Sequence, residues 1–332
     1  MEYTDIGKII KMTGGLYTVR LRPATAGSSS GPLAGQTIEC RARGHFRHAG
    51  LRPLVGDTVE VRYGNPSDTA TRDGSLPADS RTGCVLSDIL PRRNCLIRPP
   101  LANLDMMLVA AASAAPAPDV PTLDKLLCIL EHTRIEPVFV VGKCELDPAR
   151  ARELTDIYRR AGFPSFAVSC ATGEGLDGLT DFVRSAFPGK TVAASGASGV
   201  GKSTLLNTLF PGLGLVTGDI SPRIARGKNT TRHTELFPLP EIGADTYIAD
   251  TAGFSLLDFE HFDFFGLDEL STSFREFAPY LGTCRYTDCT HLKEEGCAIR
   301  EAVHAGRIAP SRHRSYCELY AILKSKPSWG KK

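Results

Sequence analysis

The chain has 332 residues, of which 42% are hydrophobic and 23% are charged, and its formal net charge is +2. This length predicts two or three domains, and the apolar content excludes an intrinsically disordered chain. The longest apolar run, residues 104–117, is shorter than the roughly 20 residues that cross a bilayer, so we expect no membrane span. The first five residues contain Glu2 and Asp5 but no basic residue, which excludes a secretory signal and indicates a cytoplasmic protein.

Positive charge is concentrated at the two ends of the sequence. Lys and Arg outnumber Asp and Glu by 13 to 9 in residues 1–95 and by 11 to 7 in residues 269–332, whereas residues 96–268 have 15 against 21. Basic ends are candidate surfaces for a polyanion. An ordinary solvated surface is the more common explanation of a charge bias of this size.

The first ninety residues have the pattern of a small β-barrel. Gly-rich or Ser-rich turns separate five short apolar segments, at residues 6–10, 16–21, 37–42, 58–63 and 84–89. Five strands at this spacing fit an OB-type barrel, which binds oligonucleotides, or an SH3-like barrel.

The next segment alternates apolar runs with amphipathic helices, a pattern typical of a doubly wound α/β fold with a parallel sheet. The predicted strands are residues 104–111, 137–141, 165–169, 191–194 and 246–249. The predicted helices are residues 123–132, 149–161, 176–187 and 202–210.

A phosphate-binding pattern, GxxxxGKS, lies between the strand at 191–194 and the helix at 202–210. Its glycines let backbone N–H groups surround phosphates, Lys202 supplies charge to the β- and γ-phosphates, and Ser203 ligates Mg²⁺. The expected nucleotide contacts are Gly196, Ala197, Ser198, Gly199, Val200, Gly201, Lys202, Ser203 and Thr204.

A DxxG pattern ends the strand at 246–249. We expect Asp250 to hold the Mg²⁺ shell and Gly253 to present its N–H to a γ-phosphate. The polar residues 226–233 are expected to form a switch loop that places Thr231, or as second choice Thr230, on Mg²⁺, although an exposed loop without a role remains open. The predicted catalytic set is Lys202, Thr231, Asp250 and Gly253.

A guanine-specific site also needs a base reader, commonly NKxD, and a second contact from an SA motif. Both occur in altered form upstream of the phosphate loop: Lys143 and Glu145 follow one predicted strand, and Ser169, Cys170 and Ala171 follow the next. The motif order is therefore a circular permutation of the usual one.

The C-terminal part contains a compact set of metal-ligating residues, Cys284, Cys289, His291 and Cys297. Three thiolates and one imidazole are the complement for a tetrahedral structural zinc. Arg285, Lys293, Arg300, Arg307, Arg312 and Arg314 surround this cluster and are expected to face RNA phosphate. The scattered cysteines, Cys40 and Cys84 among them, are expected to be ordinary buried thiols.

A permuted motif order between a barrel and a Cys/His cluster resembles the RsgA (YjeQ) family of small ribosomal subunit biogenesis GTPases. Four further segments resemble the sequences of this family: residues 40–44, 55–57, 90–94 and 98–103. The resemblance implies a multidomain protein: an OB-type barrel at 1–95, a circularly permuted P-loop GTPase domain at 96–268 and a helical zinc-binding domain at 269–332.

The resemblance also implies an activity: hydrolysis of GTP to GDP and phosphate, stimulated by the small ribosomal subunit whose late maturation the family assists. The implied cofactors are GTP or GDP, Mg²⁺ and one structural Zn²⁺. The implied partners are the small subunit and its rRNA, with no membrane, and the expected state is a monomer.

Three residues depart from the family pattern, and a fourth departs from the pattern of GTPases in general. Gly142 and Glu145 stand where the base reader usually has Asn or Thr and Asp, and Asn229 replaces a histidine of the switch motif. Phe254 follows the DxxG pattern, where GTPases of the usual type carry a water-orienting glutamine. We therefore expect slow hydrolysis by the protein alone.

Two other classes of function fit part of the sequence. A P-loop kinase with a zinc-stapled lid accounts for the phosphate loop and the metal, and an RNA-binding module accounts for the barrel and the Cys/His cluster. Release of free phosphate from GTP distinguishes the GTPase from both.

Overall fold

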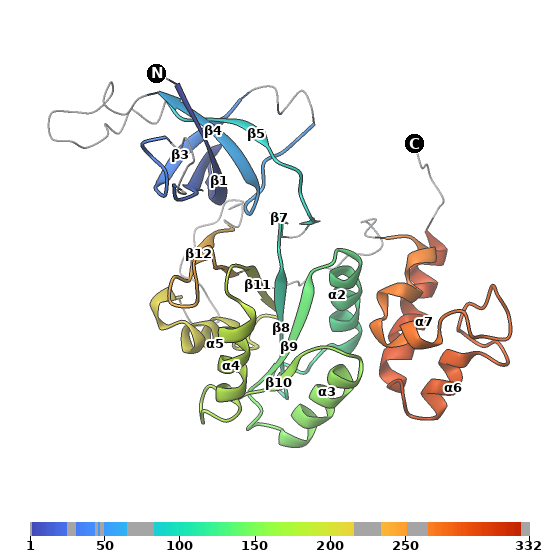
Figure 1. The fold of residues 1–332 in the computed structure, drawn as a ribbon. Helices are drawn as coiled ribbons and strands as arrows, with labels where there is room; N and C mark the ends of the chain where they lie inside the picture. The colour runs from blue at the N-terminus through green and yellow to red at the C-terminus, as the bar shows by residue number, and fades with distance from the viewer. Residues whose placement is uncertain are drawn as a thin grey trace, which may run out of the picture. The chain divides into compact units, whose positions relative to one another are not determined.

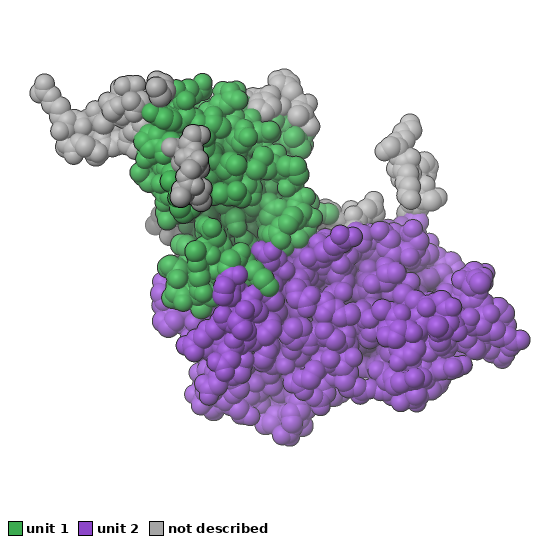
Figure 2. Space-filling model, viewed as in Figure 1, with its two compact units in different colours: residues 1–104, 189–192, 227–251 green, residues 105–188, 193–226, 252–332 purple. Residues whose placement is uncertain are grey.

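The computed structural model describes residues 2–24, 31–43, 46, 50–64, 83–97, 99–215, 234–250 and 265–326. The chain packs as two compact units, coloured separately in Figure 2. The first contains residues 1–104, 189–192 and 227–251, and the second contains residues 105–188, 193–226 and 252–332. Among the described residues, no helix combines the length and the apolar character needed to cross a membrane.

The N-terminal part forms a closed five-stranded barrel in the order β1-β2-β3-β5-β4 (Figure 1). Its strands are β1 (Glu2–Thr13), β2 (Leu16–Leu21), β3 (Thr37–Ala42), β4 (Thr58–Gly64) and β5 (Val85–Ile89). β3 pairs with β5 in parallel, while β4 pairs antiparallel with β1. This crossed order is that of an OB-type barrel and decides between the two barrel types that the sequence left open.

Alternating side chains build the barrel core. In β4, Val59, Val61 and Tyr63 are buried whereas Arg62 is exposed, because successive residues of a strand point to opposite faces. β1 is longer than the predicted segment at 6–10 because its two halves serve different partners. Residues 2–8 pair with β4, and residues 7–13 pair with β2.

Residues 55–57 and 90–94, two of the segments that resemble the family, are held together by polar side-chain contacts. The buried carboxylate of Asp57 accepts two hydrogen bonds from Arg92, at 2.7 and 2.8 Å. Asn103 donates to the carbonyl of Gly56 at 3.0 Å. A Cβ at Gly56 would lie 2.0 Å from the carbonyl oxygen of Ala102, so only glycine fits this close approach.

A six-stranded sheet follows, in the order β10-β9-β8-β11-β13-β12. Its strands are β8 (Met106–Ala112), β9 (Glu136–Gly142), β10 (Ser165–Ala167), β11 (Thr191–Gly196), β12 (Leu236–Pro238) and β13 (Tyr247–Asp250). β8, β9 and β10 are parallel, as predicted. The other edge carries a strand that was not predicted from the sequence, β12, which is antiparallel to β13. A two-stranded hairpin, β6 (Cys95–Leu96) and β7 (Leu101–Ala102), precedes the sheet.

The helices between these strands begin close to their predicted positions. They are α2 (Val120–His132), α3 (Pro148–Arg160), α4 (Leu176–Ala186) and α5 (Lys202–Leu209). Asp119 caps α2 by accepting from the amide of Thr122, and Asp147 caps α3 by accepting from that of Arg150. These caps satisfy amides that have no partner inside the helix.

The C-terminal segment contains α6 (Ala298–His304) and α7 (Pro310–Ser325), preceded by 3₁₀ turns at Leu267–Glu269, Ser271–Ser273 and Arg275–Tyr280. α7 packs against α2. Arg312 of α7 is fully buried and donates to Asp124 of α2 at 2.7 Å and to Glu276 at 2.6 Å. The expectation that Arg312 faces RNA is therefore wrong: its charge is neutralised inside the fold, whereas Arg314 is exposed.

Replacing Arg312 by methionine is expected to lower the free energy of unfolding by about 3–5 kcal/mol, because it leaves the carboxylates of Asp124 and Glu276 buried without a counter-charge. Urea denaturation followed by circular dichroism measures the change. The matched control is Arg314→Met, an exposed position two residues away, which should shift stability by less than about 0.5 kcal/mol. Equal stabilities for the two variants would contradict a structural role for Arg312.

Candidate functional site

The phosphate loop joins the end of β11 to the start of α5. Gly201 precedes the helix with a φ of +92°, a left-handed conformation that glycine adopts without strain. The first amides of α5 have no intrahelical partner and lie at the positive end of the helix dipole, an arrangement that binds anions. Ala197, Ser198 and Gly199 are exposed, and Lys202 and Ser203 are half-buried.

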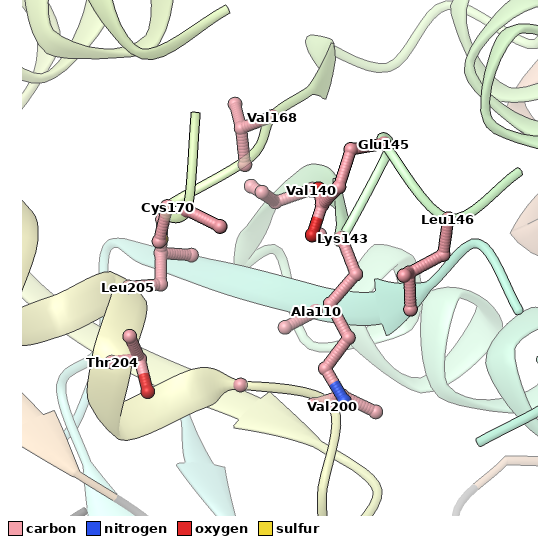
Figure 3. A pocket seen from close by; sticks show the side chains of 13 residues that line it. Ala110, Val140, Lys143, Glu145, Leu146, Val168, Cys170, Val200, Thr204 and Leu205 are labelled. Carbon is pink, nitrogen blue, oxygen red and sulfur yellow. The ribbon is translucent and has the colours of Figure 1, made fainter. Parts of the chain in front are cut away.

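A cavity of about 350 Å³ lies beside this loop (Figure 3). Its walls come from β8, from β9 and the loop after it, from the segment that follows β10, and from the phosphate loop and first turn of α5. The lining residues are Ala110, Val140, Gly142, Lys143, Glu145, Leu146, Val168, Cys170, Ala171, Val200, Gly201, Thr204 and Leu205. Seven of the predicted nucleotide-contacting residues meet here: Lys143, Glu145, Cys170, Ala171, Val200, Gly201 and Thr204.

Lys143 connects two sides of the cavity. Its φ of +55° is unusual for a residue with a side chain. Its ammonium group donates to the carbonyls of Ala115 and Gly199, both at 2.7 Å, and its own carbonyl accepts from Ser113 at 2.6 Å. Lys143 therefore fixes the loop after β8 against the phosphate loop, so it shapes the cavity.

Glu145 supplies the cavity with an acceptor. Its Oε2 atom is buried and has no hydrogen-bond partner among the described residues, and Figure 3 shows the carboxylate near Val140 and Lys143. Leaving such an oxygen unpaired costs free energy, which a ligand carrying adjacent N–H donors would recover. The N1–H and exocyclic N–H₂ of guanine are donors of this kind.

The predicted second base motif enters the cavity only in part. Cys170 and Ala171 line it, whereas Ser169 is fully buried. The Ser169 hydroxyl accepts from the amide of Thr172 at 3.1 Å, and its carbonyl accepts from Gly173 at 2.9 Å. Ser169 therefore holds the turn that presents its two neighbours.

Several lining residues were not singled out from the sequence. Leu146 lines the cavity and is 55% exposed. An apolar residue directly after Glu145 was the one sequence feature that could have identified it as part of the site. Ala110, Val140, Val168 and Leu205 belong to apolar runs that read as core. A strand that ends in a pocket has the same apolar pattern as one that ends in the core.

The expected magnesium ligands are described only in part. Ser203 lies in the first turn of α5, and Asp250 is the last residue of β13. Thr231 and Gly253, and with them Thr230, Asn229 and Phe254, lie outside the described residues.

The four predicted metal ligands come together before α6. One ligand atom from each of Cys284, Cys289, His291 and Cys297 lies within 4.8 Å of all the others. His291 Nδ1 is 3.6 Å from the Sγ atoms of both Cys284 and Cys297. Zn–S bonds of about 2.3 Å and Zn–N bonds of about 2.0–2.1 Å at tetrahedral angles would separate sulfur from nitrogen by about 3.6 Å. The cluster thus fits a structural zinc.

Neighbouring groups hold this loop in shape. Burial alone would raise the pKa of Glu294, but hydrogen bonds from Thr290 and from backbone amides outweigh it and lower the pKa to about 2. His313 hydrogen-bonds to the carbonyl of His291 at 2.8 Å. His291 itself has a φ of +61°. Burial lowers its pKa, which favours the neutral imidazole that binds metal.

Known proteins match the chain over nearly its whole length. Residues 89–260 match the RsgA GTPase family, and residues 6–70 match the RsgA N-terminal domain. The small ribosomal subunit biogenesis GTPase RsgA of Agathobacter rectalis is 37% identical over 324 residues, which cover 97% of this chain and 99% of that protein. The protein of the same name from Geobacillus thermodenitrificans is 38% identical over 324 residues, covering 96% and 98%.

Two solved structures have the same fold. YjeQ from Thermotoga maritima superimposes with a TM-score of 0.73 at 29% identity, covering 98% of this chain and 100% of that one. YloQ, described as a circularly permuted GTPase, superimposes with a TM-score of 0.70 at 30% identity, covering 98% of each chain. The likeness therefore includes the barrel, the sheet and the C-terminal segment.

Proposed function

Because the chain belongs to the RsgA GTPase family, we propose that it binds the small ribosomal subunit and assists its late maturation by hydrolysing GTP. The relatives are named small ribosomal subunit biogenesis GTPases. The observation that most directly supports GTP binding is the cavity beside the phosphate loop, with the unpaired Oε2 of Glu145 inside it.

The phosphates, the base and the magnesium ion each have proposed partners in the chain. The loop from Gly196 to Thr204 and the ammonium of Lys202 hold the phosphates, and Glu145, Cys170 and Ala171 contact the base. Ser203 and Thr231 would ligate Mg²⁺, Asp250 would lie in its shell, and Gly253 would donate to the γ-phosphate. When bound, the ion would supply positive charge to the transferred phosphoryl group.

A kinase whose lid is held together by zinc is the less favoured interpretation. Such a lid normally lies within the nucleotide domain, whereas the metal cluster follows all the nucleotide motifs and precedes α6. A kinase would also leave the unpaired oxygen of Glu145 beside the phosphate loop without a role. The products distinguish the two: the GTPase releases free phosphate, and a kinase yields a phosphorylated acceptor.

The rRNA contact is proposed for the outer face of the barrel. Arg20, Arg41 and Arg62 are exposed there, on β2, β3 and β4. One guanidinium group can donate two parallel hydrogen bonds to the oxygens of a phosphate, and an OB-type barrel commonly binds oligonucleotides.

With a ribosomal subunit as its partner, the protein is proposed to act as a monomer in the cytoplasm.

Small ribosomal subunits are expected to raise the rate of GTP hydrolysis at least about tenfold. Phe254 cannot orient water, so turnover without the subunit should be far below the ~1–100 s⁻¹ typical of kinases. Docking on the small subunit is proposed to supply the group that orients the attacking water. Because phosphate contacts release counterions, the stimulation should weaken as salt rises. Phosphate release with purified subunits at two salt concentrations measures it.

Charge reversal at Arg41 and Arg62 should abolish this stimulation and leave the unassisted rate intact. Arg152→Glu, an exposed arginine of α3, is the matched control and should keep it. An unchanged rate with small subunits at low salt, or equal stimulation by large subunits, would overturn the proposed partner.

A further inference from the structure

Two cysteines are neighbours where β3 meets β5 in the barrel. These strands pair in parallel, with Arg41 opposite Val85 and Ala42 opposite Leu86. Cys40 is the residue before Arg41 in β3, and Cys84 directly precedes β5, so the two cysteines come immediately before the first paired residues of the two strands. The amide of Arg41 donates to the carbonyl of Cys84 at 3.2 Å, which holds the two strands together at this level.

The two cysteines differ in exposure. Cys84 comes directly before β5, two residues before Leu86, which is fully buried. Cys40 is also fully buried and Cys84 is half-buried, and each of the two thiols shifts the pKa of the other, that of Cys40 upward and that of Cys84 downward. Neighbouring strands lie about 4.7–4.9 Å apart, and disulfides join Cα atoms about 4.4–6.8 Å apart. The backbone spacing therefore suits a cross-link.

We propose that Cys40 and Cys84 form a reversible disulfide, linking β3 to β5, when the protein encounters a peroxide. Both cysteines are free thiols in the structure. Neither belongs to the nucleotide cavity or to the metal cluster, so this is a separate modification site. In a reducing cytoplasm such a pair becomes oxidised only transiently.

Cys84 is the attacking residue because it is the more accessible of the two. Its interaction with the neighbouring Cys40 thiol lowers the pKa of Cys84, which favours the reactive thiolate. The thiolate attacks one oxygen of hydrogen peroxide, the O–O bond breaks, and hydroxide leaves and takes up the proton released by Cys84. The product at Cys84 is a sulfenic acid.

Cys40 then completes the cross-link. Its sulfur attacks the sulfenic sulfur, the S–O bond breaks, and the departing hydroxyl leaves as water with the proton of the Cys40 thiol. Overall, two thiols and one hydrogen peroxide give one disulfide and two waters.

The cross-link would reinforce the barrel where it is least paired. The β3–β5 ladder contains two residue pairs, whereas the β2–β3 ladder contains five. A covalent bond at its end should suppress local separation of the two strands. Amide hydrogen exchange in β3 and β5 should therefore slow at least about tenfold on oxidation.

Peptide mapping of the zinc-loaded full chain tests the proposal. The protein is treated with hydrogen peroxide, denatured, alkylated and digested with trypsin without reductant. Cys40 and Cys84 then lie in separate peptides, residues 21–41 and 82–92, each with one cysteine. We expect the two peptides to be linked in at least about half of the molecules, and dithiothreitol to release them.

Two variants make the result specific. Cys84→Ala should remove the linked species, whereas Cys95→Ser, at an exposed cysteine, should leave its yield unchanged; circular dichroism verifies that both fold. Peroxide treatment that oxidises Cys95 yet leaves both barrel cysteines alkylatable would overturn the proposal. So would conversion of Cys84 to a sulfinic acid in place of the disulfide, or hydrogen exchange in β3 and β5 that oxidation does not change.

Discussion

Replacing Lys202 by alanine is expected to reduce GTP hydrolysis by a factor of about 10²–10³, with and without ribosomal subunits. Lys202 is the first residue of α5, where its ammonium group can reach the β- and γ-phosphates held by the loop amides. Removing one positive group from developing phosphate charge costs a factor of this size. Phosphate release at saturating GTP measures the change.

Lys324→Ala is the matched control for that experiment. Lys324 is exposed in the last turn of α7, so its removal changes the net charge by the same amount away from the phosphate loop. Both variants should melt within a few degrees of the native chain. Hydrolysis that survives Lys202→Ala would show that the loop between β11 and α5 does not hold the reacting phosphates.

Loss of the metal cluster is expected to have a comparably large, but local, effect. The purified protein should carry about one zinc per chain, and Cys289→Ser should lose it together with the structure of residues 284–297. Structural zinc sites contribute about 10–16 kcal/mol to folding in isolated zinc-finger peptides. Metal analysis and hydrogen exchange measure the two effects.

The remainder of the C-terminal segment should stay folded in Cys289→Ser. Arg312 holds α7 to α2, and Arg275 pairs with Glu131 and Glu136 at 2.6 and 2.9 Å. GTP binding should therefore persist. Cys317→Ser is the control, because Cys317 lies outside the four-residue cluster. Protein prepared without chelator that contains no zinc, or equal loss of zinc in both variants, would contradict a structural site.

The architecture was predictable because hydrophobic periodicity and turn residues act locally. The five barrel strands and the strand–helix alternation from Met106 to Leu209 follow directly from such patterns. The short β12, Leu236–Pro238, was not predictable, because three residues carry no periodicity. Its antiparallel direction depends on the long-range pairing with β13.

The site was predictable in its residue types and less so in its geometry. The phosphate-binding and Cys/His patterns require fixed spacings, so the sequence reveals them. The roles of Lys143 and Ser169 depend on backbone conformation and on distant carbonyls. The burial of Arg312 likewise depends on Asp124 and Glu276, which are 188 and 36 residues away in sequence. A sequence records that an arginine is charged and does not record whether its partner is RNA or a carboxylate.

Competition between GTP and ATP for binding to the native chain and to Glu145→Asp tests the guanine-reading cavity most directly. The native chain should prefer GTP by at least about tenfold, because the carboxylate accepts from guanine N–H groups and faces a lone pair in adenine. Glu145→Asp should widen that preference, since the shorter side chain restores the position of the aspartate usual in this motif. Equal affinities for GTP and ATP in the native chain, unchanged by the substitution, would show that the cavity beside the phosphate loop does not read the base.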